Sequence, residues 1–359
     1  MPRPIVAVLL GGLLCLPAIP QSQEKPQTPA QTPAQEQPNT RISVSVNEVI
    51  VPVTVTDDKG KFVSNLEARD FRVLDEGRPQ RVKFFSHEQK QPIVVGFLVD
   101  LSNASRIHWK TYQDAILELV WNLLPGDPRY SGYLVGYSND AELVVNTTSD
   151  SDKIADKVRK MKPGGGAALF DAIYMACTNR SLIAGEPYEP RRIVIVIGDG
   201  HDSASKKSME EVLELAQRNL ITVYAISTMA FGFANEDQAV LERLTTETGG
   251  HVEYPLNNPY KDVAGYLSNP QDAGNYALTV GTGGYAAQIS AGIINAIAGI
   301  SGEITTQYVL RYIPDIDPDG KPKVTRKIKV EIPDLPTVRM HYRPYYYPNP
   351  VPGTAPTGQ

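Results

Sequence analysis

The sequence predicts an α/β protein with a doubly wound, mostly parallel, Rossmann-like sheet that is inserted in or followed by a small β module. Strand and helix patterns alternate from Ile93 to about Val252, which is typical of helices that cover both faces of a parallel sheet. Two of the strands, IVVGFLVD and RRIVIVIG, are almost wholly apolar, as expected of strands buried on both faces. Segments before and after this region alternate apolar and polar residues, which indicates further β strands.

The first residues indicate an export signal. Arg3 precedes an apolar run over residues 5–16, which has the length of a signal-peptide core and is too short to span a bilayer. We therefore assign residues 1–20 to a signal peptide. The mature chain should not be an integral membrane protein, and we expect it in the periplasm, the cell envelope or the extracellular space. Lipid attachment at Cys15 is disfavoured because Leu14 stands where a lipobox has a small residue.

The segments that flank the α/β region have distinct compositions. Residues 21–40 are rich in Pro, Gln and Thr and contain no large apolar residue, so we expect a linker there. Residues 41–90 should form a small β module, with turns at residues 57–60 and at Glu76-Gly77. A C-terminal helix and strands over residues 286–347 should complete this module, because an isolated hairpin is only marginally stable.

The α/β domain itself should occupy residues 91–256. Helices are expected where apolar residues recur with helical spacing, within residues 106–124, 151–161, 169–183, 208–219 and 235–250. Residues 257–285, rich in Gly and Asn, should be a loop insertion, and residues 348–359 a disordered tail. The uncharged stretch over residues 273–302 is weakly hydrophobic, so we expect a packed helix in it and not a membrane span.

Bulk composition excludes several functions. The chain of 359 residues has 35 Lys and Arg against 40 Asp and Glu, and this net charge of −5 offers no basic footprint for nucleic acid or an anionic membrane. Removal of the signal would leave Cys177 as the only cysteine, so no internal disulfide can form, and we interpret Cys177 as a helix residue of the core. The 5 histidines show no zinc-binding spacing.

Acidic and hydroxyl side chains follow the two apolar strands. Asp100 ends the first strand and Asp199 follows the second. Since ligands of doubly wound sheets bind beyond the carboxyl ends of the strands, the two carboxylates should converge at one edge. Ser102 and Ser105 follow Asp100, and a Gly-rich loop over residues 163–168 precedes a helix. Carboxylates and hydroxyls in such loops are ligand types of Mg²⁺ or Mn²⁺.

These residues and several longer segments resemble a known family. The chain is similar to von Willebrand factor type A domains, and more closely to the acidobacterial-type family related to them, over roughly residues 41–347. The segments that carry the resemblance are ARDFRVLDEGRPQRVKFFS, LLPGDPR, KPGGGAALFDAI, VIGDGHDS and QYVLRYIPD. The resemblance implies a metal-ion-dependent adhesion site, in which an Asp-x-Ser-x-Ser motif, a Thr in a Gly-Gly-Thr loop and a strand-terminal Asp-Gly hold the ion.

The adhesion-site pattern is only partly present. Asp100, Ser102 and Asp199 match its first Asp, first Ser and last Asp. Ala104 stands at the second Ser position and Ala167 at the Thr position, so two oxygen ligands are replaced by methyl groups. Because Mg²⁺ requires a nearly ideal octahedral shell, these two alanines argue against tight binding of Mg²⁺ or Mn²⁺.

Two further residues are auxiliary candidates at this site. Ser105 lies one residue beyond the expected serine position, and Asp202 adds a carboxylate to the second loop. Neither restores the expected ligand geometry. An alternative interpretation of Asp100 is that it hydrogen-bonds the Ser102 loop without any ion.

The function that we expect is non-enzymatic binding or adhesion to a protein or an extracellular matrix-like ligand through the strand-end face. Ser102 has no partnered His, and the glycines at 164–166 lack the following Lys-Ser/Thr of a phosphate loop. Two alternatives stay open. The chain is a scaffold or assembly protein whose metal site has lapsed, or it is a metal-dependent hydrolase that uses Asp100 and Asp199.

Overall fold

The structure is a computed structural model that describes residues 48–87, 92–106, 109–179, 182, 191–228, 236–255, 283–315 and 324–348. All of these residues belong to one compact unit, Ser45–Gln359. The expected signal peptide, the linker, almost all of the Gly/Asn-rich insertion and the C-terminal tail lie outside the described residues.

A six-stranded sheet forms the centre of the α/β domain, in the order β10-β9-β8-β5-β6-β7. Neighbouring strands are parallel except for the antiparallel pair of β6 and β7, so the prediction of a mostly parallel sheet is confirmed. All residues of β5 are buried, as coverage of both faces requires. The strands are β5 (Ile93–Asp100), β6 (Tyr130–Tyr137), β7 (Ala141–Thr148), β8 (Arg191–Gly198), β9 (Ile221–Ser227) and β10 (Val252–Glu253).

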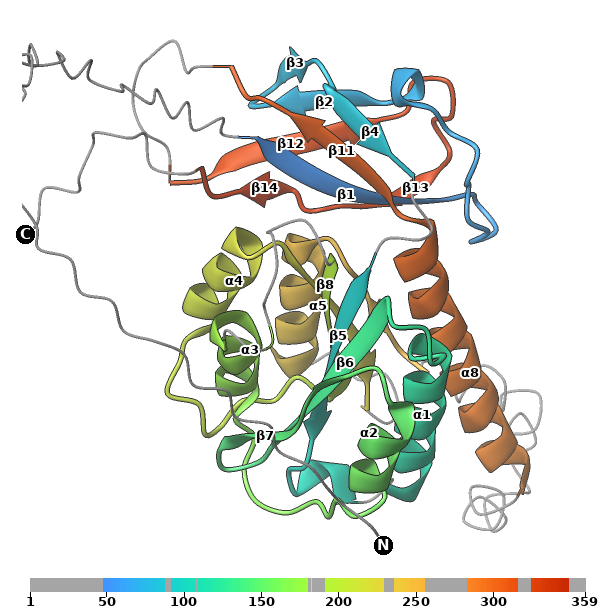
Figure 1. Ribbon diagram of the computed structural model, residues 1–359, viewed down its shortest axis with the longest axis vertical. Helices are drawn as coiled ribbons and strands as arrows, with labels where there is room; N and C mark the ends of the chain where they lie inside the picture. Colours follow the sequence, from blue (N-terminus) through green and yellow to red (C-terminus); the bar gives the residue numbers. More distant parts are fainter. Residues whose placement is uncertain are drawn as a thin grey trace, which may run out of the picture. The chain divides into compact units, whose positions relative to one another are not determined.

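Helices cover both faces of this sheet (Figure 1). One face packs against α1 (Trp109–Leu123), α2 (Ser151–Val158) and α8 (Gly283–Thr306), and the other against α3 (Leu169–Thr178), α4 (Met209–Arg218) and α5 (Glu236–Thr248). On α8, buried isoleucines recur with helical spacing at Ile293, Ile297, Ile300 and Ile304, which explains its packing on the sheet. Within the part of the chain that the structure describes, no helix has the length and apolarity needed to cross a membrane.

The C-terminal ends of α2 and α3 differ from those expected. Helix α2 ends at Val158 and not at residue 161, and its N-cap is Asp150, whose carboxylate accepts hydrogen bonds from the backbone N–H groups of Asp152 and Lys153. Helix α3 ends at Thr178, several residues earlier than its apolar pattern suggested. The N-cap of α4 is Ser208, which forms a reciprocal capping box with Glu211.

Two four-stranded sheets form the β module, in the orders β13-β1-β11-β4 and β14-β12-β2-β3. Their apolar side chains make one common core. In the first sheet β1 lies between β11 and β13, so strands from both ends of the chain share a sheet. The strands are β1 (Val49–Thr56), β2 (Arg72–Asp75), β3 (Arg78–Gln80), β4 (Phe84–Ser86), β11 (Tyr308–Tyr312), β12 (Arg326–Glu331), β13 (Arg339–His341) and β14 (Tyr345–Tyr346).

The turn between β2 and β3 has the expected chemistry. Glu76 and Gly77 both have positive φ angles, 50° and 79°, as a two-residue hairpin turn requires. The strands β11 and β12 follow one another in the chain but do not pair with each other. β11 pairs with β1 and β4, while β12 pairs with β2 and β14.

A buried ion pair lies inside the β module. Asp75 is fully buried, and its carboxylate accepts hydrogen bonds from Arg326 Nε at 2.8 Å, Tyr312 Oη at 2.9 Å and Tyr346 Oη at 2.9 Å. Burial, followed by the charge of Asp75, raises the pKa of both tyrosines, so they remain hydroxyl donors at neutral pH. Four strands therefore meet at one carboxylate.

Replacing this carboxylate should destabilise the module strongly. We expect Asp75→Ala to lower the free energy of unfolding by about 3–5 kcal/mol, because Arg326 is left buried without its counter-charge. Urea unfolding followed by circular dichroism measures the change. The control is Asp58→Ala in the exposed turn after β1, which should stay within about 0.5 kcal/mol of the wild type. A loss below about 1 kcal/mol for Asp75→Ala would contradict the expectation.

Candidate functional site

The strand order reverses between β5 and β8, and the predicted site lies at this point. From β5 the chain continues to β6 on one side, whereas β8 pairs with β5 on the other side. In doubly wound sheets such a switch point opens a crevice at the carboxyl ends of the strands. Asp100 ends β5 and Asp199 directly follows β8, so the structure brings them to the same edge, together with Ser102. We call Asp100, Ser102 and Asp199 the strand-edge site.

Asp100 is held by hydrogen bonds from its own loop. The Ser102 backbone N–H donates to Asp100 Oδ1 at 2.7 Å, and Ser102 Oγ donates to Oδ2 at 3.2 Å. Asp100 is 2% exposed and Ser102 is 5% exposed. Burial raises the pKa of Asp100, the Ser102 backbone opposes this, and the charge of Asp199 raises it further, with a net increase. Such a carboxylate pair is stabilised by a proton or by a cation.

The structure shows where Ala104, Ala167 and Ser105 lie. Ala104 begins a short 3-10 helix, Ala104–Arg106, and is exposed, while Ala167 is 1% exposed. Neither side chain can offer an oxygen to an ion. Ser105 is buried and lies close enough to Asp100 to favour its charged form.

The Asp202 side chain hydrogen-bonds the N-terminal end of helix α3. Its Oδ2 accepts a hydrogen bond from the Phe170 backbone N–H at 2.9 Å, and its Oδ1 accepts one from Ser205 at 3.2 Å. Phe170 is in the first turn of α3, where a carboxylate is favoured by the helix dipole. Among the described residues, Asp100, Asp199 and Asp202 do not converge as a group of three metal-binding carboxylates. The strand-edge site thus has two carboxylates and one hydroxyl.

Backbone hydrogen bonds join the loops around the site into one surface. The Gly164 N–H donates to the Leu101 carbonyl at 2.6 Å, and the Asn103 N–H donates to the Gly165 carbonyl at 3.1 Å. Asn139 Oδ1, from the loop after β6, accepts from the Gly166 N–H at 2.7 Å. Gly165 has a φ of 107°, which favours glycine at this position. These contacts hold the loops in a fixed arrangement.

Tyr137 is a residue of this edge that the sequence did not single out. It ends β6, pairs in register with Asp100, and is fully buried. Burial, then the charges of Asp100, Asp199 and Asp202, raise the pKa of its hydroxyl. The only signal in the sequence was that YLVGYS places a tyrosine near the end of a predicted strand.

Comparison with protein families identifies the α/β domain. Residues 95–260 match the family model of the von Willebrand factor type A domain. The chain contains a von Willebrand factor type A domain. A comparison with curated proteins found no match.

Several solved structures are similar to the type A domain. BatB from Bacteroides thetaiotaomicron is 16% identical, with a TM-score of 0.37, and the match covers 56% of this chain and 98% of BatB. The PilB minor pilin from Streptococcus sanguinis is 12% identical, with a TM-score of 0.40 and coverages of 60% and 62%. Proximal thread matrix protein 1 from the mussel byssus, with a zinc-occupied MIDAS motif, is 15% identical, with a TM-score of 0.37 and coverages of 51% and 46%. The assignment rests on the family match.

A second group of potential ligands lies away from the strand-edge site. His251, Glu303 and His341 place one ligand atom each within 4.8 Å of one another. No spacing pattern in the sequence indicated this group, because its members are far apart along the chain. We call these three residues the junction cluster.

Close packing behind the strand-edge site can be tested at Gly198, the last residue of β8. A Cβ atom there would lie 2.9 Å from Asp100 Cβ and would overlap the Tyr137 hydroxyl. We expect Gly198→Ala to lower the free energy of unfolding by about 1–3 kcal/mol, because the type A domain must shift to make room. Gly164→Ala is the matched control, since a Cβ at Gly164 meets nothing within 4 Å. Equal thermal stabilities of the two variants would refute the close approach.

Proposed function

We propose that the chain is an exported, non-enzymatic binding protein whose type A domain contacts a protein or matrix-like ligand through the strand-edge face without a tightly held metal ion. The observation that carries the proposal is the state of Asp100. Both of its carboxylate oxygens accept hydrogen bonds from Ser102, while Ala104 and Ala167 offer no oxygen ligands. The hydrogen-bonding capacity of Asp100 is thus used within its own loop, which supports a face that does not depend on a tightly held ion.

The exposed groups around the site suit recognition of a protein. Asn103, Asn139 and His201 are exposed on three loops of this edge. The His201 Nδ1 atom lies 3.1 Å from Asp237 Oδ1, and this hydrogen bond raises the pKa of His201. Polar groups on fixed loops bind a partner with little ordering cost.

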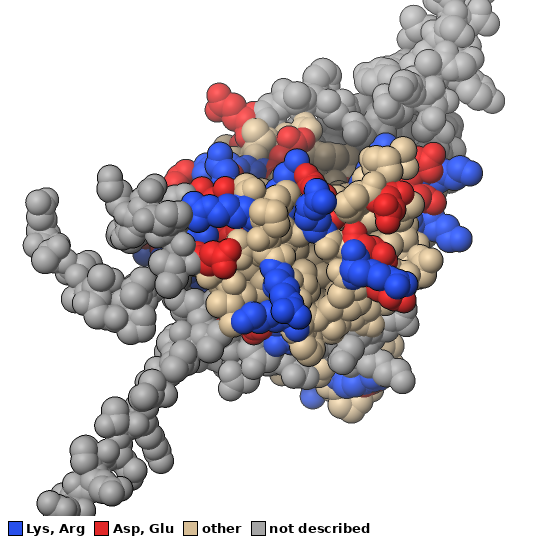
Figure 2. Space-filling view, turned by 90° about the horizontal axis from the view of Figure 1, so that it is seen from above, with Lys and Arg blue, Asp and Glu red and all other residues tan. Residues whose placement is uncertain are grey.

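Charge on the β module gives no support to nucleic-acid binding. Figure 2 shows one face of the molecule, seen from above in Figure 1, and Lys and Arg are interspersed with Asp and Glu on it. A nucleic-acid site would need a continuous basic stripe. Ser102 Oγ donates to Asp100, and no histidine hydrogen-bonds it among the described residues, which supports binding over catalysis.

Titration with metal ions distinguishes this proposal from metal-dependent adhesion. We titrate the chain without its signal segment with Mg²⁺ or Mn²⁺ in a calorimeter. Up to roughly millimolar ion, we expect the wild type and Asp100→Ala to give the same heat, because two ligand positions carry methyl groups. The double variant Ala104→Ser/Ala167→Thr should gain additional heat. Adding Asp100→Ala to the double variant should remove it again.

One result would overturn the proposal. If the wild type binds Mn²⁺ at micromolar concentration and Asp100→Ala abolishes that binding, the face is metal-dependent after all. Circular dichroism of each variant confirms that the fold is retained, so that loss of heat reports on the ion alone.

The binding face itself can be blocked. Ala104 is exposed beside the site, so Ala104→Arg adds bulk and charge there without filling the core. We expect this change to reduce capture of envelope or extracellular proteins by the immobilised chain about 10-fold or more, as loss of an interface contact does. Asp58→Arg, in the exposed turn of the β module, should leave capture unchanged. The reverse pattern would assign binding to the β module.

A further inference from the structure

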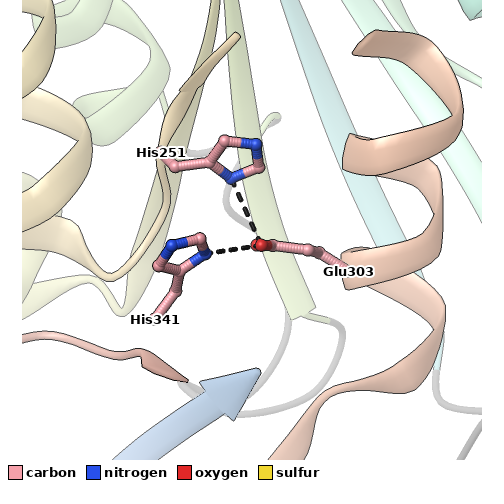
Figure 3. Close-up of side chains that lie close together, drawn as sticks. All are labelled: His251, Glu303 and His341. Carbon is pink, nitrogen blue, oxygen red and sulfur yellow. Dashed lines mark hydrogen bonds and ion pairs between the residues drawn. The ribbon is translucent and has the colours of Figure 1, made fainter. Parts of the chain in front are cut away.

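Three metal-ligating side chains from separate segments converge at the junction between the type A domain and the β module. His251 directly precedes β10, Glu303 lies in α8, and His341 ends β13. Figure 3 shows both imidazoles directed at the Glu303 carboxylate. His341 Nδ1 lies 2.6 Å and His251 Nδ1 lies 3.3 Å from Glu303 Oε1.

We propose that the junction cluster, His251, Glu303 and His341, binds a divalent transition metal ion of the zinc class. Two imidazole nitrogens and one carboxylate oxygen are a recognised ligand set for zinc with three protein ligands. Tetrahedral zinc at bond lengths near 2.0–2.1 Å separates its ligand atoms by about 3.3 Å. The His251–Glu303 separation already has this length, and the His341 contact needs to open only slightly.

Unsatisfied polar atoms support a missing ligand at this point. Glu303 is 3% exposed, and its Oε2 accepts no well-oriented hydrogen bond among the described residues, although the buried Tyr224 hydroxyl lies close to this carboxylate. His251 Nδ1 is likewise buried there without a correctly oriented hydrogen bond. Buried polar atoms without partners are rare because each costs free energy. A metal ion held by Glu303 Oε1 and the two imidazoles would satisfy His251 Nδ1.

His251 is already oriented in the way that metal-bound histidines usually are. Its other nitrogen, Nε2, lies 2.8 Å from Glu253 Oε1. A carboxylate on the far nitrogen commonly fixes the ring and raises its basicity as a ligand. Gly299 of α8 permits this arrangement, because a Cβ there would lie 2.7 Å from Glu253 Oε1. Glu253 is therefore a positioning residue for His251.

Two carboxylates contact the imidazoles of the cluster. Glu253 contacts His251, and Glu303 contacts both His251 and His341. The rings of His251 and His341 are stacked with centroids 5.0 Å apart, so a single ion beside Glu303 can lie close to both rings.

The site would link three parts of the fold and keep an open position. The side chain of His341 is 37% exposed, while that of Glu303 is 4% exposed, so one side of the cluster faces solvent. Zinc with three protein ligands takes water in its fourth position. The ion would join the type A domain, α8 and the β module, and would resist their separation.

Zinc and cobalt titrations of the chelator-treated, tag-free chain without its signal segment test the proposal. All variants carry Asp100→Ala, so that the strand-edge site cannot contribute. We expect the parent protein to bind one Zn²⁺ per chain and to have a higher thermal unfolding midpoint with Zn²⁺ than without it. Bound Co²⁺ should give the visible absorption bands of an ion in a low-symmetry ligand shell. Glu303→Gln and His341→Ala should weaken binding about 100-fold or more, and Glu253→Gln about 10- to 100-fold.

His201→Ala is the matched control, because His201 also pairs with a carboxylate, Asp237, but belongs to no three-residue group among the described residues. It should leave Zn²⁺ affinity unchanged. His341 is half-exposed, so its removal should leave the fold intact, which the thermal midpoint without metal verifies. Absence of Zn²⁺ binding by the parent protein, or binding that survives both Glu303→Gln and His341→Ala, would show that the cluster is an ion-pair network only. Neither outcome affects the proposed function.

Discussion

One buried carboxylate ties the two ends of the β module together. Asp75 of β2 accepts hydrogen bonds from Arg326, Tyr312 and Tyr346, which lie on three other strands. A buried charge is costly unless it is paired and fully hydrogen-bonded, so these strands have to be in place together. The type A domain is consequently an insertion between strands that depend on one another. The segments that precede and follow the type A domain in the chain both contribute strands to the same two sheets.

Arginine side chains link the inserted domain to the segments that lead into this module. Arg343, close to the C-terminus, donates to the carbonyl of Ile50 in β1 and to that of Gln217 in α4. Arg191, at the start of β8, donates to the Ile304 carbonyl in α8 and to Gln307 between α8 and β11. Guanidinium groups suit this role because each offers five donors in a fixed plane. Glu303 of the junction cluster directly precedes Ile304, and His341 lies two residues before Arg343.

Local sequence patterns predicted the helices and most strands. The residues that meet at the two sites, and the shortest strands, depend on tertiary packing. Apolar runs ending in Asp100 and Asp199 are a signal within a few residues, and the structure places both at the switch point. Tyr137 gave little signal, because its importance depends on which strand lies beside β5. His251, Glu303 and His341 gave none, since only the return of the C-terminal strands brings them together. Likewise β13 and β14 are too short for a periodic pattern, and pairing with β1 and β12 defines them.

The inserted topology also imposes an order on folding. The sheet of the type A domain is complete once Glu253 is available, and most of its strand pairs join near neighbours in the chain. β1 is made earlier, yet β11 and β13, its partners on both sides, are made last. While the chain is being synthesised, β1 therefore presents two unpaired edges and its valines to solvent, which is the condition under which strands aggregate. A stop just before β13 would leave one edge of β1 permanently open.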